Sequence, residues 1–338
     1  MPPALYAELT PWYHLVDPPE DHADEAACFI EAFTGAIVGA STTLLELGSG
    51  AGNNASHLKA RFACTLTDIA EPMLALSRMR NPGCEHVAGD MRTLRLGRTF
   101  DAVLAHDGIT YMTTEPDLRA AIETAFVHTR PGGAAIFTPD DLADTFVEGA
   151  QLLEGHDGDR SLRCIEWSWD PVPGDDKARV EYGLLMRERG EVRSFHDRHE
   201  TGLFPRATWL RLLQDAGFVV DVVRRPIADD ETDEVFLCRR PWARRDAPSG
   251  SGREHAMTRR PPAAATRHLE WVKASGPQGG HGVLPRHRRA EAPGQTGAVG
   301  ALSRVRAAAS RWRSCRCRTP ACRHRRRASA RPRSAPST

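Results

Sequence analysis

The chain has 338 residues, a formal net charge of +1 at pH 7 and a hydrophobic content of 41%, which is enough to build a buried core. The near-neutral total hides two unlike segments, because residues 241–338 hold 22 of the 45 basic residues and only 4 of the 44 acidic ones. No apolar run approaches the ~20 residues that cross a bilayer, and the N-terminus lacks the pattern of a signal peptide. We therefore expect a cytoplasmic protein without membrane segments.

Helix-like and strand-like stretches alternate along residues 1–240. Turn residues at 81–83 and 130–133 separate them. This rhythm predicts an α/β fold, in which a parallel sheet is covered by helices on both faces. The expected helices span residues 21–35, a stretch ending near 61, 72–80, 117–129 and 206–216, and the expected strands span 43–47, 64–69, 85–88, 100–105, 134–138, 218–223 and 234–238.

The rhythm changes at about residues 158–204, where three strand-like stretches follow one another without helices. In residues 178–187, apolar side chains alternate with charged ones, which is the pattern of a strand with one face in water. The segment therefore predicts an inserted three-stranded antiparallel sheet, with strands at 161–169, 178–187 and 191–203. Residues 1–240 would form one domain that carries this insert.

A glycine-rich turn follows the expected strand at 43–47. Gly48, Gly50 and Gly52 allow the chain to turn sharply and let a ligand approach the backbone. The helix that follows offers free N–H groups and the positive end of its dipole. The dinucleotide fingerprint needs a third glycine three positions after the second, and this chain has Asn53 there. The turn therefore favours a nucleotide ligand other than NAD.

Acidic residues stand at the ends of the first three expected strands. A carboxylate at Glu46 suits a cationic ligand group, such as an ammonium. Asp68 lies about 20 residues beyond the loop, where an acid can accept hydrogen bonds from ribose hydroxyls; capping a turn is the alternative role. Asp90 could accept from an adenine amino group with Met91 against the ring, or the pair could form a plain turn.

These motifs are joined by Phe100-Asp101-Ala102-Val103-Leu104 and by the turn at 130–133. In combination they resemble the successive motifs of class I S-adenosylmethionine (SAM)-dependent methyltransferases, over about residues 5–240. The resemblance implies a Rossmann-like sheet with strand order 3-2-1-4-5-7-6, an antiparallel seventh strand and SAM as the cofactor. It also implies that the glycine loop lines the methionine part of SAM, while Asp68 contacts the ribose. The SAM-binding residues implied in this way are Glu46, Gly48, Ser49, Gly50, Gly52, Asp68, Ile69, Asp90 and Met91.

A narrower likeness concerns the acceptor side of the site. Residues 5–16 and the end of the insert at 203–206 look like those of deoxysugar amino-methyltransferases from antibiotic pathways. In those enzymes the insert covers the acceptor sugar, and the likeness implies that Tyr13 lies over the SAM site. The chain departs from them after the fourth strand, where it has the polar His106 and Asp107.

Methyl transfer from a sulfonium is an in-line displacement, in which alignment and exclusion of water supply much of the acceleration. The expected function is SAM-dependent methylation of a small-molecule amine or hydroxyl, under a lid formed by the insert. His106 and Asp107 are the candidate catalytic residues, because either could take a proton or bind an ammonium. Contact with SAM or capping of the strand is the alternative role for His106. The candidate acceptor-binding residues are Asp140, after the fifth strand, and Tyr182 and His199, on the insert.

The basic tail at 241–338 is rich in Arg, Ala, Pro, Gly and Ser and has no regular period, so we expect it to be disordered. Its Cys315-x-Cys317 and Cys322-x-His324 pairs do not match the ligand spacing of zinc sites, so no metal is expected. Two other functions stay open. The tail could recruit nucleic acid to a binding or modifying protein, although the acidic body argues against nucleic acid as substrate. The domain could also be a catalytically silent SAM-binding module.

Overall fold

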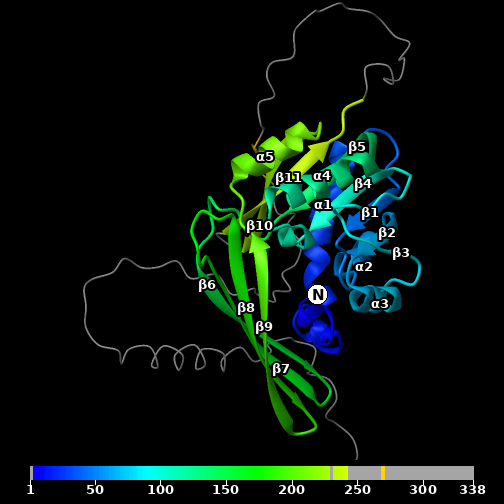
Figure 1. The fold of residues 1–338 in the computed structure, drawn as a ribbon. Helices are drawn as coiled ribbons and strands as arrows, with labels where there is room; N and C mark the ends of the chain where they lie inside the picture. The colour runs from blue at the N-terminus through cyan, green and yellow to red at the C-terminus, as the bar shows by residue number, and fades with distance from the viewer. Residues whose placement is uncertain (1–2, 229–230, 243–267, 271–338) are drawn as a thin grey trace, which may run out of the picture. The chain divides into compact units, whose positions relative to one another are not determined.

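The computed structural model describes residues 3–228, 231–242 and 268–270, and Figure 1 shows how its elements are arranged. The larger sheet has eight strands in the order β12-β10-β11-β5-β4-β1-β2-β3. β11 runs antiparallel to its neighbours β5 and β10, whereas the other pairs are parallel. The predicted order with an antiparallel seventh strand is therefore confirmed. These strands are β1 Thr43–Leu47, β2 Ala63–Asp68, β3 Glu85–Ala88, β4 Phe100–His106, β5 Thr129–Thr138, β10 Val219–Ala228, β11 Glu231–Arg239 and β12 His268–Glu270.

Apolar side chains pack helices onto both faces of this sheet. α4 and α5 lie on one face, against residues such as Leu45 and Phe137. α1 and α2 lie on the other, against Leu44 and Ile136. Since neighbouring residues of β1 and β5 enter opposite layers, the middle of each strand is a continuous apolar run, as expected for central parallel strands. The helices are α1 Ala23–Ala36, α2 Asn53–Leu58, α3 Glu71–Arg80, α4 Glu115–His128 and α5 Arg206–Asp215, and the short 3-10 turns are η1 Ala4–Tyr6, η2 Thr10–Leu15, η3 Pro19–His22 and η4 Gly108–Tyr111.

The insert between β5 and α5 is a separate antiparallel sheet with strand order β6-β7-β8-β9. The prediction of three strands was wrong, because β6 Gly149–Asp157 precedes β7 Arg160–Trp169, β8 Lys177–Glu188 and β9 Glu191–Gly202. β6 is an edge strand interrupted by Gly155, where a Cβ would lie 2.2 Å from the carbonyl oxygen of Leu15. A glycine inside a strand weakens the strand signal but permits this close backbone approach.

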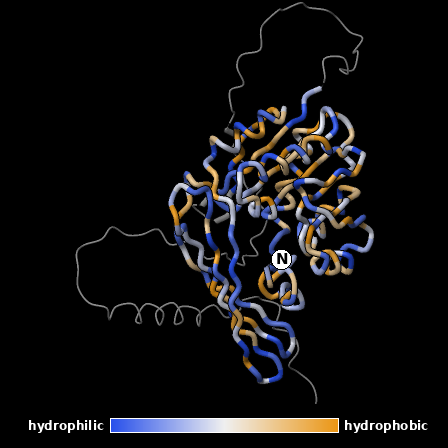
Figure 2. Tube along the Cα trace, in the orientation of Figure 1, coloured by the Kyte–Doolittle hydropathy of each residue, from blue (hydrophilic) through white to orange (hydrophobic). Residues whose placement is uncertain are grey.

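One face of the insert is covered by the N-terminal segment. Leu5, Leu9 and Trp12 pack on a cluster that includes Leu162 and Leu184. Figure 2 shows that both hydrophilic and hydrophobic residues occur along the insert strands. The N-terminal turns therefore join the insert to the main sheet, and they lie beside the site described next.

The predicted disordered tail at 241–338 lies outside the described residues, apart from 241–242 and β12. β12 pairs in parallel with β10 and was not predicted, because three residues carry no recognisable period. The cysteine pairs of the tail also lie outside the described residues. Within the described part of the chain, no helix has the length and apolar character needed to cross a membrane.

Candidate functional site

The glycine loop joins β1 to α2, and its backbone conformation favours glycine at three positions. Gly48, Gly50 and Gly52 have φ angles of +74°, +53° and +71°, which side chains rarely tolerate. A Cβ on Gly52 would lie 2.4 Å from both Asn81 Nδ2 and Ser77 Oγ. The close packing of this loop on the C-terminal end of α3 thus fixes the backbone N–H groups that a ligand would meet.

Asp68 ends β2 beside this loop. Its two carboxylate oxygens accept backbone N–H groups from Gly50 at 2.8 Å and from Ala70 at 2.7 Å. Burial raises the pKa of this carboxyl. Each oxygen keeps a further lone pair, so a ribose could still be bound. The next residue, Ile69, is 66% exposed, which is a large exposure for an apolar side chain next to a buried strand.

Glu46 lies inside β1, one residue before the end of the strand. Its side chain is buried, and Oε2 has no hydrogen-bond partner among the described residues. Burial raises the pKa of Glu46 to about 7. The Ser49 hydroxyl is likewise buried without a described partner. Unsatisfied buried polar atoms are costly, so two of them beside the glycine loop indicate that a ligand completes the site.

Asp90 and Met91 follow β3. Arg92 contacts both oxygens of Asp90 through Nε at 3.0 Å, and this interaction lowers the pKa of Asp90. Met91 is largely buried, and its Cε would lie 2.8 Å from a Cβ on Gly48. Met91 therefore packs against the glycine loop, while Arg92 holds the Asp90 carboxylate.

Tyr13 packs beside the glycine loop. Its ring packs on a small cluster formed by Ala51, Ala70 and Met73, and its hydroxyl donates to Asp17 at 2.7 Å.

His106, the last residue of β4, points to the α1 layer of the sheet. Its Nε2 lies 2.9 Å from Glu25 Oε1 and its Nδ1 lies 3.3 Å from the Asn54 amide. The ring meets Phe29 edge-on, with 5.6 Å between centroids. Nε2 is also 3.1 Å from Asp107 Oδ1. His106 therefore reaches the exposed side of the site through Asp107.

Asp107 occupies a strained turn between β4 and η4. Its φ of +42° is unusual for a residue other than glycine, and such strain is often found at functional sites. Burial, and then the charge of Asp107 and a hydrogen bond with it, raise the pKa of Asp140 well above the ordinary value. The Asp140 side chain is nevertheless exposed to water, so the two carboxyls form a pair that a ligand can reach.

His199 and Tyr182 come from the insert, where their rings lie 4.7 Å apart. His199 is 1% exposed, and burial lowers its pKa. Its Nδ1 lies 2.7 Å from the hydroxyl of Tyr111, which in turn lies 2.8 Å from the hydroxyl of Tyr6. Tyr6 and Tyr111 lie beside the predicted site residues, but the sequence did not single them out as candidates. The aromatic residues of the N-terminal motif, and of the turn after β4, were the signal that could have found them.

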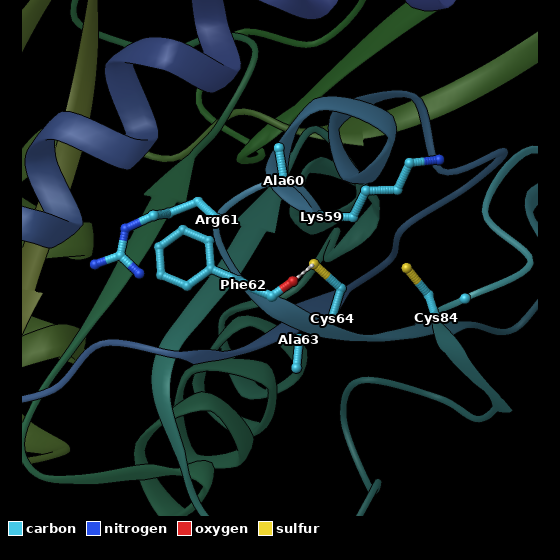
Figure 3. Close-up of a pocket in the computed structure, with 8 residues that line it drawn as sticks. Lys59, Ala60, Arg61, Phe62, Ala63, Cys64 and Cys84 are labelled. Atoms are coloured by element: carbon cyan, nitrogen blue, oxygen red, sulfur yellow. Dashed lines mark hydrogen bonds between the residues drawn. The ribbon is translucent and has the colours of Figure 1, made fainter.

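A surface pocket lies at the opposite ends of these strands, away from the glycine loop, and Figure 3 shows the residues that line it. It lies where β2 begins and just before β3, whereas the glycine loop follows the other end of β1. Burial raises the pKa of Cys64 and of Cys84, so both thiols stay protonated at neutral pH. The lining residues are Lys59, Ala60, Arg61, Phe62, Ala63, Cys64, Gly83 and Cys84.

Comparison with known proteins identifies the fold and the family. Residues 44–133 match the model of a methyltransferase domain. The chain is 30% identical over 208 residues to a dTDP-3-amino-3,4,6-trideoxy-α-D-glucopyranose N,N-dimethyltransferase of Streptomyces venezuelae, covering 60% of this chain and 85% of that protein.

Two solved structures are also similar. The crystal structure of Streptomyces venezuelae DesVI has a TM-score of 0.61 at 25% identity, over 70% of this chain and 98% of that one. The SAM-bound structure of CalS10, an amino pentose methyltransferase from Micromonospora echinaspora involved in calicheamicin biosynthesis, has a TM-score of 0.58 at 27% identity, over 64% and 91% of the two chains. Since the chain is 30% identical to a methyltransferase over 85% of that protein's length, it belongs to the class I SAM-dependent methyltransferases and uses SAM as its cofactor.

Proposed function

We propose that this enzyme transfers the methyl group of SAM to the nitrogen of a small-molecule amine, which binds as a cation beside Asp107 and Asp140. The proposal extends the shared activity of the family to one acceptor class. It is carried by Asp107 and Asp140, two exposed carboxyls at the ends of β4 and β5, because a carboxylate beside the acceptor nitrogen can pair with its ammonium.

The residues around the glycine loop fit SAM. Glu46 would receive the ammonium of its methionine part, which would satisfy the unpartnered carboxylate oxygen. Asp68 would bind the ribose, and the exposed Ile69 would cover the adenine together with Met91. The full set proposed to hold SAM is Tyr13, Glu46, Gly48, Ser49, Gly50, Gly52, Asp68, Ile69, Asp90 and Met91.

The acceptor side would be closed by the insert, with Tyr182 and His199 facing the acceptor. The packing of the N-terminal turns on the insert supports such a lid, since the same turns place Tyr6 and Tyr13 beside the glycine loop. In this arrangement Asp107 and Asp140 orient the nitrogen for in-line attack on the sulfonium methyl, and the lid excludes water. His106 acts as a positioning residue that holds Asp107.

The test is a methylation assay with isotope-labelled SAM. Acceptors would be the amino sugars named for the relatives, the same sugars without the nucleotide, simple amines and matched alcohols. We expect label on nitrogen and none on the alcohols. The double variant Asp107→Asn/Asp140→Asn should raise KM for the amine about 10-fold or more, because no carboxylate then remains to pair with the ammonium.

Asp159→Asn is the matched control, since Asp159 lies in the exposed turn between β6 and β7. It should leave KM unchanged. Methylation of hydroxyls alone would overturn the amine assignment. SAM binding without transfer to any acceptor would favour the silent module.

A further inference from the structure

A series of hydrogen bonds extends from Tyr6, beside the glycine loop, to the interior of the insert. The hydroxyls of Tyr6 and Tyr111 are 2.8 Å apart, and the Tyr111 hydroxyl lies 2.7 Å from His199 Nδ1. His199 Nε2 lies 3.1 Å from Asp197 Oδ2. The four side chains come from η1, η4 and β9, which are distant in sequence. Both β9 members are largely buried, at 1% exposure for His199 and 8% for Asp197.

The donor and acceptor roles along this series of hydrogen bonds follow from Asp197, which ends it. Asp197 Oδ2 already accepts the Leu5 amide at 2.8 Å, so as a carboxylate it takes a proton donor from His199, namely Nε2–H. A neutral His199 then accepts at Nδ1, and Tyr111 donates to it. Tyr111 in turn accepts from the Tyr6 hydroxyl. Every O–H group thus points toward His199, and the lone pairs of the Tyr6 oxygen are left for a donor in the site.

Tyr6 stands where such a donor would be found. Its ring packs on the cluster of Ala51, Ala70 and Met73 at the SAM loop. Burial raises its pKa, and so do the charges of Asp140 and Asp107. Tyr6 therefore lies beside the glycine loop, and its free lone pairs offer an acceptor for a proton of a substrate bound next to SAM.

We propose that Tyr6, Tyr111, His199 and Asp197 form a proton relay that removes one proton from the acceptor's ammonium before methyl transfer. This inference rests on the proposed methylation of an amine. Tyr6 is the catalytic residue that touches the nitrogen, and the other three act through it as positioning residues.

The step balances in protons and electron pairs. An ammonium N–H proton moves to the Tyr6 oxygen while the Tyr6 proton moves to Tyr111 and the Tyr111 proton moves to His199 Nδ1. The neutral amine then uses its freed lone pair to form the N–CH3 bond as the S–CH3 bond breaks, giving S-adenosylhomocysteine. The His199 imidazolium, paired with Asp197, returns its proton along the same chain to water after the product leaves.

The surroundings of His199 favour this role. Its neighbours are Asp197 on its own strand, Tyr182 on β8, Tyr111 on η4 and Tyr6 on η1. Burial lowers the pKa of His199, while the hydrogen bond with Asp197 raises it. The imidazole is therefore neutral and able to accept at neutral pH, and the carboxylate stabilises the charged form once it is made.

The first test is a pH profile of kcat/KM for Tyr111→Phe, which removes one hydroxyl from the middle of the relay. The acceptor probe is unmethylated dTDP-3-amino-3,4,6-trideoxy-α-D-glucopyranose. At pH 7 we expect a loss of about 100-fold. The loss should disappear above the pKa of the acceptor amine, where the acceptor arrives neutral. An equal loss at every pH, or no loss, would overturn the relay.

His196→Gln is the matched control for His199→Gln. His196 lies on the same strand but on its exposed face, paired with Glu181 at 2.7 Å. It should leave the profile unchanged, whereas His199→Gln should reproduce the profile of Tyr111→Phe.

The second test needs no turnover. Nitrogen-15 NMR of labelled histidines, recorded with S-adenosylhomocysteine bound at pH 7, should show His199 as the neutral Nε2–H tautomer. Tyr111→Phe should shift its Nδ1 resonance. An Nδ1–H tautomer or a charged ring would overturn the relay. Failure of the wild-type enzyme to methylate the probe, with this NMR result intact, would count against the amino-sugar acceptor and not against the relay.

Discussion

The cofactor side and the acceptor side of this site are formed by different kinds of structure. The cofactor side depends largely on backbone conformation and comes from a short stretch of sequence. Its three glycines with positive φ, together with Glu46 and Asp68, belong to two successive β-strands and their loops. The acceptor side consists of side chains from separate segments, with Asp107 after β4, Asp140 after β5 and His199 on β9.

This difference shows how one cofactor site can serve different acceptors. Backbone geometry leaves little freedom, since a Cβ on Gly48 or Gly52 would collide with its neighbours. Side chains on loops and on an insert can change one at a time without disturbing the sheet. The two sides should therefore respond differently to substitution.

The largest effect is expected from Gly52→Ala. The added Cβ would lie 2.4 Å from Asn81 and Ser77, and the φ of +71° adds strain. The loop must shift, so the affinity for SAM should fall by about 100-fold or more, corresponding to roughly 3 kcal/mol of overpacking and strain. Calorimetric titration with SAM measures the loss.

Gly39→Ala is the matched control. Gly39 has a φ of +88° but nothing within 4 Å of an added Cβ, so it carries strain without collision. It should cost about 1 kcal/mol of stability and leave SAM affinity unchanged. Equal SAM binding by both variants would show that the cofactor side tolerates substitution as well as the acceptor side does. That result would contradict the expected difference between the two sides.

A smaller effect is expected from pH. The pKa of Glu46 in the free enzyme is raised to about 7 by burial, and a bound ligand ammonium would favour its ionised form. The affinity for S-adenosylhomocysteine should thus fall as the pH falls through 7, by roughly eightfold between pH 7.5 and pH 6. Glu46→Gln should bind weakly at both values and show no such slope, and a slope that survives the substitution would remove Glu46 from the ligand's ammonium.

The contrast also explains what the sequence could predict. β1 and β3 were predicted at their observed bounds: β1 is a short, mostly buried apolar run, and β3 follows the turn at 81–83 that ends the preceding helix. β6 was missed because Gly155 interrupts it at the contact with Leu15, and that contact depends on the tertiary fold.

The site residues likewise differ in how far local sequence could predict them. The glycine loop and Asp68 could be predicted, since their spacing lies within one βαβ unit. The direction of His106 toward Glu25 and Asn54 could not, because it depends on which face of β4 the side chain occupies. Tyr6 and His199 are separated by most of the domain, and no local pattern brings them together.

The smallest effect is expected from removing the basic tail. Both sides of the site are made of residues before 242, and β12 ends at Glu270. A chain ending after Glu270 should therefore keep its SAM affinity and its kcat/KM for an amine acceptor within about twofold, since surface changes away from a site are nearly neutral. It should also lose any salt-sensitive binding to nucleic acid, which depends on neutralised phosphates. Loss of methyl transfer with SAM binding intact would instead mean that the tail delivers the substrate, and the acceptor side would then extend beyond the three segments that carry Asp107, Asp140 and His199.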